Sequence, residues 1–324
     1  MDLAHGAGLP ISVCVTSASP HEVKLVEETL DANFAPGLGT TYETTSRYGA
    51  MPPTRPPGPA LKSTKRQKGQ CMHEPPSQPA NASSWHRRVV IFLAAWMLTV
   101  SGLVLALVWH NPIKRAVVGM AWGLILLWVG GCGLAMLCWG NALSAAVRRL
   151  PLPWSLKFVL GCTALACIEE AITTLMTNCA PLFGVQVGQA YITASASYFD
   201  VILYHSVVVF VPMFVGWALL LRWWRFSPFA VFLLFGTTGL LAETLSFGPE
   251  NLGNFAMWIF VYGLMVWLPA HWVPEDRPAR KPPRWAYPLA VIFPMLMIPL
   301  GVVLAPWLWL TPKHPPIHFA PIPR

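Results

Sequence analysis

The residues with the clearest chemical potential are a few polar side chains that stand inside long apolar segments. Glu169 and Glu170 are adjacent in one such segment, and His205 lies in the next one along the chain. Glu243 lies near the end of a further segment, and Asn254 lies near the start of the one after it. An ionisable side chain costs roughly 2.5–3.5 kcal/mol at the centre of a membrane helix, so such residues mark functional sites by default. We predict these five as the catalytic residues of an intramembrane site.

This set of side chains suits hydrolysis. Glu170 or Glu169 would act as the general base on a water molecule, because one of two adjacent buried carboxylates is expected to be ionised and the other protonated. His205 would orient that water or donate a proton, and the Asn254 amide would stabilise a developing oxyanion. The sequence therefore favours a membrane-embedded hydrolase that uses a Glu-activated water. Its substrate would be a small molecule, a lipid or a peptide.

The order of these residues is similar to that of the CPBP intramembrane proteases, which pair an EExxxR motif with FxxxH and HxxxN/D motifs. The resemblance covers residues 169–254, and the matching residues are Glu169, Glu170, His205 and Asn254. The residues that depart from the motifs are Thr174 for arginine, Val201 for phenylalanine and Glu250 for the second histidine. The resemblance implies intramembrane proteolysis. We do not take it as family membership, because three residue types of the motifs differ.

Other interpretations stay open. Buried carboxylates and a histidine could relay protons or bind a cation in a small-solute or proton-coupled transporter. His205, Glu170 and Glu243 could ligate a metal ion, although no ligand-spaced motif supports this and we assign no metal and no cofactor. The polar side chains could also hydrogen-bond helices to one another in a non-catalytic assembly or structural protein.

The elements that must position these residues are membrane-spanning helices. The chain is 55% hydrophobic and 11% charged, whereas a soluble domain carries roughly 25% charged residues. About 20 apolar residues in a helix cross a hydrocarbon core of about 30 Å. The segments that meet this requirement are Val89–Trp109, Val117–Trp139, Ser155–Asn178, Phe199–Leu221, Phe226–Ser246, Asn251–Val273 and Tyr287–Leu310. We predict an all-α polytopic membrane helix bundle of about seven transmembrane helices, the last of them interrupted by prolines.

Basic residues between the segments predict the orientation. With the N-terminus inside, the inner flanks contain Arg87, Arg88, Arg148, Arg149, Lys157, Arg222, Arg225, Arg277, Arg280, Lys281 and Arg284. The outer flanks then contain only Lys114, Arg115, Lys313 and Arg324. Since cytoplasmic loops are enriched in Lys and Arg, we predict an N-in, C-out protein that is multi-pass in the plasma (cell inner) membrane. Topology and anionic lipid explain the net charge of +8, so the expected partner is the lipid bilayer and not nucleic acid.

Helical spacing predicts that the polar residues converge. Residues three or four apart share one face of a helix. The stripes with this spacing are Glu170–Thr174–Thr177, Gly236–Gly239–Glu243–Ser246 and Asn251–Asn254–Trp258, and Tyr198 shares a face with His205. In the N-in orientation all of them fall in the outer half of the membrane, which predicts one outward-facing Glu/His/Asn pocket. We interpret Asn251 as a helix N-cap and Asp200 as an N-cap or first-turn acid.

Residues outside the apolar segments predict the remaining organisation. Residues 1–84 read as a disordered, basic, Pro-rich tail with one possible short helix at 21–34, followed by a transmembrane domain at 85–312 and a short C-terminal tail at 313–324. The first residues lack a basic stretch followed by an apolar core, so we expect no cleavable signal peptide. Translation from Met51 or Met72 would leave the membrane domain intact.

Overall fold

The structure, a computed structural model, describes residues 84–304 and 317–320. Residues 1–83 of the predicted tail at 1–84, its helix at 21–34 and most of the predicted tail at 313–324 lie outside the described residues. Within residues 84–304 and 317–320 the chain forms helices and no strand. Five helices are long and apolar enough to cross a membrane, or six if one bent pair counts as a single span. The all-helical membrane architecture is therefore confirmed in this coarser form.

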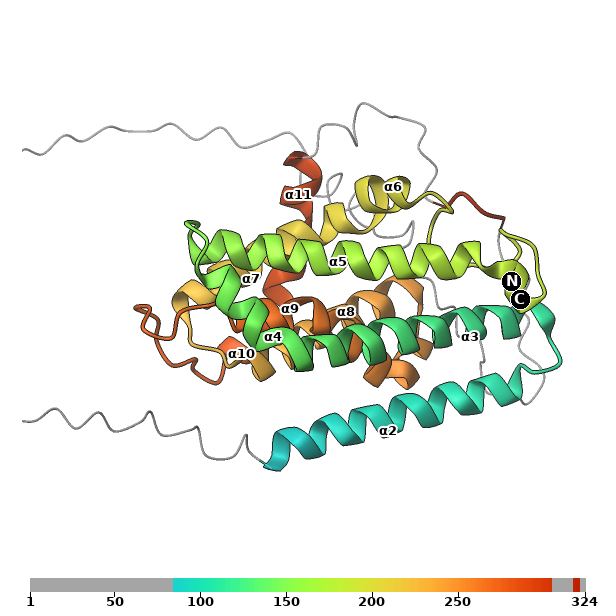
Figure 1. Cartoon of the computed structure of the whole chain (residues 1–324), viewed down its shortest axis with the longest axis horizontal. Helices are drawn as coiled ribbons and strands as arrows, with labels where there is room; N and C mark the ends of the chain where they lie inside the picture. Colours follow the sequence, from blue (N-terminus) through green and yellow to red (C-terminus); the bar gives the residue numbers. More distant parts are fainter. Residues whose placement is uncertain (1–83, 305–316, 321–324) are drawn as a thin grey trace, which may run out of the picture.

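The elements follow the predicted segments closely in order (Figure 1). They are α2 (Ser84–Leu107), α3 (Pro112–Leu124), the π-helix η1 (Ile125–Cys132), α4 (Gly133–Arg148), α5 (Trp154–Asn178), the 3₁₀ helix η2 (Ala180–Phe183), α6 (Tyr198–Asp200), the π-helix η3 (Val201–His205), α7 (Val207–Trp223), α8 (Pro228–Phe247), the 3₁₀ helix η4 (Pro249–Asn254), α9 (Phe255–Ala270), α10 (Ala286–Leu296) and α11 (Ile298–Leu304).

The second span is longer than predicted. α3, η1 and α4 form one run of 37 residues from Pro112 to Arg148, about 55 Å at 1.5 Å per residue. The run begins early because the Asn111 side chain accepts a hydrogen bond from the Lys114 amide at 3.0 Å and Pro112 occupies the first helical turn. Hydropathy underestimates the length of this helix, because its ends are polar. The capping residues at its start nevertheless favour a helix there.

The fourth span is broken, not continuous as predicted. The segment Tyr198–His205 and the helix α7 meet at an angle of 49°. At the junction the Ser206 amide donates to the Val201 carbonyl at 3.0 Å, a bond five residues back along the chain, and the Ser206 hydroxyl donates to the same oxygen at 3.2 Å. Such π-type bonding is a recognised cause of sharp helix kinks.

The seventh predicted span, Tyr287–Leu310, is represented by two short helices. α10 contains Pro294 and ends at Leu296, and α11 begins at Ile298. The apolar stretch Ala286–Leu300 is shorter than the five candidate spans. A proline inside a helix removes a backbone donor and clashes with the preceding turn, which accounts for the interruption. Both helices pack against α7, and α10 also packs against α8.

α9 is the central helix of the bundle. It packs against α8, α5, α4 and α2, and 72% of the most apolar window of its span is buried. In Figure 1 it is seen between α5 and α4, while α2 lies along the outer edge of the bundle. The predicted close approach at the α8 glycines is observed: a Cβ atom on Gly236 would lie 2.6 Å from the Ile259 carbonyl oxygen of α9. The same close approach is seen from α9, where a Cβ atom on Gly263 would lie 2.7 Å from the Phe232 carbonyl oxygen of α8.

This crossing makes a stability prediction. Gly236→Ala should destabilise the helix bundle by about 1–3 kcal/mol, because the added methyl group meets backbone atoms of α9 that cannot move aside. The matched control is Gly102→Ala in α2, where a Cβ atom meets nothing within 4 Å. Thermal unfolding of the detergent-solubilised chain, followed by the helical circular dichroism signal, measures both. Equal unfolding midpoints for the two variants would contradict the crossing.

Candidate functional site

Three carboxyl groups from two helices are buried close to one another. Glu169 and Glu170 of α5 are 1% and 0% exposed, and Glu243 of α8 is 2% exposed. The Glu169 carboxyl group is near enough to both Glu170 and Glu243 for direct electrostatic interaction. α5 and α8 each pack against α9. The structure therefore brings these three predicted residues together.

The Glu170 carboxyl group is oriented by two hydroxyl groups. Thr173, on the next turn of α5, donates to Glu170 Oε2 at 3.1 Å, and the Ser206 hydroxyl at the bend of the fourth span also lies against this carboxyl group. The other oxygen, Oε1, has no hydrogen-bond partner among the described residues. Glu169 Oε1 is also without a partner in this part of the chain. Buried polar atoms are nearly always paired, so two bare carboxyl oxygens on consecutive buried residues require an explanation.

Glu243 belongs to a hydrogen-bonded network that joins α8, η4 and α9. The Tyr262 hydroxyl donates to Glu243 Oε1. The Asn251 side-chain amide donates to the Glu243 backbone carbonyl at 3.3 Å, and its oxygen accepts from Trp258 Nε1 at 3.2 Å. All four residues are buried. The network holds the Glu243 end of α8 against the beginning of α9.

The predicted N-cap assignment of Asn251 is wrong. α9 begins at Phe255, so its N-cap position is Asn254, and Asn251 lies inside the preceding 3₁₀ helix. The 3₁₀ helix η4 begins at Pro249, a residue that favours the first turn of a helix. The spacing of the two asparagines gave no sign of this separate element. The Asn254 side chain is 7% exposed and makes no hydrogen bond to another described residue. Asp200 was predicted as either an N-cap or a first-turn acid. It lies in the first turn of α6, where Ser197 is the N-cap.

His205 lies at the end of η3 and is 4% exposed. Its ring meets the ring of His318 edge to face, with the ring centroids 5.7 Å apart. His318 is in the described C-terminal segment, and its amide donates to the Ala194 carbonyl at 2.9 Å. His205 is also followed directly by Ser206, which touches Glu170. The imidazole thus packs against His318 of the C-terminal segment, and its link to the acids is through the neighbouring residue Ser206.

A buried loop covers this end of α5. Residues 190–195, between η2 and α6, are at most 4% exposed, although connecting segments normally lie on the surface. The Ile192 amide donates to Thr177 Oγ1 at 3.1 Å, and the Asn178 side chain donates to the Ala196 carbonyl at 2.9 Å. Irregular backbone within a membrane protein is tolerated where it is buried in protein or lines a cavity. This loop encloses the polar half of α5.

Sequence reasoning missed three residues that contact the acids, namely Thr173, Ser206 and Tyr262. Tyr262 lies four residues after Trp258, so extending the Asn251–Asn254–Trp258 stripe by one turn would have found it. Ser206 carries no such signal, because its position depends on the π-helical bend. The alternative metal site receives no support: no group of three or more His, Cys, Asp or Glu side chains is placed to hold a metal ion within residues 84–304 and 317–320.

The chain matches no protein-family model, no curated protein sequence and no solved structure. Its apolar helices are those of an integral membrane protein. Any finer functional assignment therefore depends on the chemistry of the buried acids.

Proposed function

We propose that the chain is a membrane-embedded hydrolase in which a glutamate activates water. The observation that supports this proposal is the pair of unpartnered carboxyl oxygens, Glu169 Oε1 and Glu170 Oε1, in a fully buried setting. Water molecules or polar substrate groups bound at these atoms would satisfy both of them. Paired carboxyl groups in different protonation states are a recurrent arrangement for general acid–base catalysis.

In the proposed reaction, ionised Glu170 removes a proton from water as the oxygen attacks a substrate carbonyl carbon. Thr173 and Ser206 hold the Glu170 carboxylate in the required orientation. Glu169 carries a proton, because it is buried and two further carboxyl groups lie near it, and it delivers that proton to the leaving group. The proton taken up by Glu170 then returns to Glu169, so both groups regain their starting states.

The remaining residues would complete the site. The free Asn254 amide would donate to the oxyanion that forms on the substrate, and His205 would orient water or pass protons beneath the 190–195 loop. Glu243, held by Tyr262, would keep the proton on Glu169 by repulsion. A lipid or a peptide is the favoured substrate, because the site is enclosed by apolar helices and would be reached from the bilayer.

The transporter alternative is less well supported. Between the glutamates and the beginning of α5, the buried side chains of the helix are those of Phe158, Cys162 and Ala166, each 0% exposed, and Gly161 is buried beside them. A conduction path needs polar or water-lined surface along its length, and these side chains form a dry layer. A purely structural role would explain buried polar residues that bond to other helices, but it leaves the two bare carboxyl oxygens without a purpose.

The proposed function is tested by comparing membrane lipids and small peptides, by mass spectrometry, between wild-type cells and cells lacking the gene. If the protein is a hydrolase, an ester or amide accumulates in the deletion cells while its acid product disappears. Expression of the wild-type chain restores the wild-type levels, and expression of the Glu170→Gln chain does not. A shift in a solute with no change in covalent structure would support transport. Complementation by Glu170→Gln would leave only a structural role.

We also propose that the protein is multi-pass in the plasma (cell inner) membrane with its N-terminus inside, from the distribution of basic residues. In a cysteine-free background, Gln186→Cys before the buried loop should react with a membrane-impermeant maleimide in intact cells. Glu275→Cys, in the exposed loop after α9, should react only after permeabilisation. The reverse pattern would invert the orientation.

A further inference from the structure

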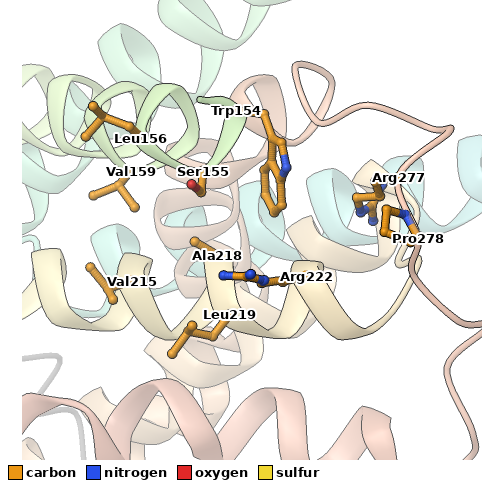
Figure 2. Close-up of a pocket in the computed structure, with 10 residues that line it drawn as sticks. All are labelled: Trp154, Ser155, Leu156, Val159, Val215, Ala218, Leu219, Arg222, Arg277 and Pro278. Atoms are coloured by element: carbon orange, nitrogen blue, oxygen red, sulfur yellow. The ribbon is translucent and has the colours of Figure 1, made fainter. Parts of the chain in front are cut away.

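A groove lies at the other end of the bundle from the buried acids. It has a volume of about 560 Å³ and is formed between the first turns of α5 and the last turns of α7. Figure 2 shows its lining, with aliphatic side chains at one end and two arginines beside Trp154 at the other. The lining residues are Trp154, Ser155, Leu156, Val159, Val215, Ala218, Leu219, Arg222, Arg277 and Pro278. This volume lies within the range of sites for small ligands.

One part of the groove is an aliphatic wall that faces outward from the bundle. Leu156 is 40% exposed and Val215 is 37% exposed, and both belong to spans that pass through the membrane. Val159 and Leu219 continue the wall between them. An exposed apolar surface on a membrane helix contacts lipid chains, so this part of the groove suits an acyl chain.

The other part of the groove is cationic. The Arg277 side chain is fixed there by three backbone carbonyls: its Nε donates to Leu221 at 2.8 Å, its Nη1 to Pro274 at 2.7 Å and its Nη2 to Trp224 at 3.2 Å. Its guanidinium also lies 5.9 Å from the centre of the Trp154 ring. Arg222 is exposed and has no hydrogen bond or ion pair with another described residue. No lining residue is acidic, although Glu275 lies near Arg277 and Arg225 adds a further positive charge.

We propose that this groove binds an anionic phospholipid, with an acyl chain along the aliphatic wall and the phosphate between Arg222 and Arg277. The charge is complementary to the phosphate, and an apolar wall continuous with a cationic end fits an amphiphile better than a soluble anion. In the N-in orientation the groove opens at the cytoplasmic leaflet, where anionic lipids are enriched. The first turn of α5 adds amide donors, since Pro153 at the N-cap provides no side-chain acceptor. The site is separate from the proposed hydrolytic centre.

The test is native mass spectrometry of the purified full chain in detergent, titrated with phosphatidylglycerol or with phosphatidylcholine of the same acyl chains. We expect phosphatidylglycerol to bind more tightly, and Arg222→Gln to weaken it about fivefold, since one basic residue near a lipid surface contributes about 1 kcal/mol. Arg222→Lys should retain most of the preference. The matched control is Arg149→Gln, an exposed arginine that does not line the groove.

A second pair of measurements separates a lipid site from a soluble anion site. Val215→Trp should obstruct the aliphatic wall and weaken both lipids, with correct folding verified by size-exclusion chromatography. Glycerol phosphate, which has the headgroup charge without acyl chains, should not displace phosphatidylglycerol. The proposal fails if Arg222→Gln and Arg149→Gln bind phosphatidylglycerol equally, if the two lipids bind equally, or if glycerol phosphate competes.

Discussion

Replacing Glu170 with glutamine is expected to lower the rate of hydrolysis by about 10²–10⁴-fold while leaving the bundle folded. Glutamine has the same shape as glutamate, and its amide oxygen can still accept the hydrogen bond from Thr173. It cannot take a proton from water, so only the chemical step is lost. The rate is measured on the substrate that accumulates in deletion cells, with the purified chain in lipid nanodiscs.

The control for charge removal is Glu275→Gln, in the exposed loop between α9 and α10. It should retain the wild-type rate. Unfolding midpoints of both variants separate a catalytic loss from a folding loss. A Glu170→Gln chain that is folded and hydrolyses at the wild-type rate would exclude Glu170 as the base.

The second large effect concerns the pairing of the acids. Glu169→Gln should slow hydrolysis by about 10²-fold, because the leaving group loses its proton donor. The double variant should be only slightly slower than Glu170→Gln alone, since residues that act as one unit show strongly non-additive losses. The two carboxyl groups are in direct electrostatic contact, which is the physical basis for this expectation.

Rates of the wild type, both single variants and the double variant form one thermodynamic cycle. If the losses of the two single variants multiply in the double variant, the glutamates act independently and the shared-proton mechanism is wrong. A similar cycle between Glu170 and the exposed Glu275 should be additive, because these residues lie on different elements at opposite ends of the bundle.

The apolar core of the fold was predictable because long uncharged segments have few alternatives to membrane helices. α5 begins at Trp154 and ends at Asn178, within one residue of the predicted segment, and α8 is similarly close. The bend at Ser206 was not predictable, because it arises from π-type hydrogen bonds and from a contact with Glu170, a residue distant in the sequence. The count of seven spans is not confirmed, because prolines interrupt the last apolar segment.

Parts of the candidate site followed from helical spacing. The three- and four-residue repeats placed Glu170 and Thr174 on one face, and both are buried. The glycines near Glu243 indicated a close helix contact, which α9 provides. The buried loop over α5 could not be foreseen, because its residues have no periodicity, and its burial depends on bonds to Thr177 and Asn178 that only the folded chain brings within reach.

The two ends of α5 have opposite electrostatic character. Its second half carries the buried acids, and its first turns adjoin Arg222 and Arg277 of the groove. The apolar side chains between them keep the two regions apart. A substrate that enters the acid site from the bilayer therefore need not cross the cationic end, and a lipid bound in the groove would anchor the bundle without occupying the acids.

The most direct test of the proposed chemistry is hydrolysis in water enriched in ¹⁸O. Proteoliposomes made from native membrane lipids and peptides are incubated with wild-type or Glu170→Gln chain, and the acid products are analysed by mass spectrometry. Activation of water by Glu170 predicts that ¹⁸O enters a product carboxyl group with the wild-type chain and does not with the variant. Equal labelling by the two chains would contradict the proposed role of the buried glutamates.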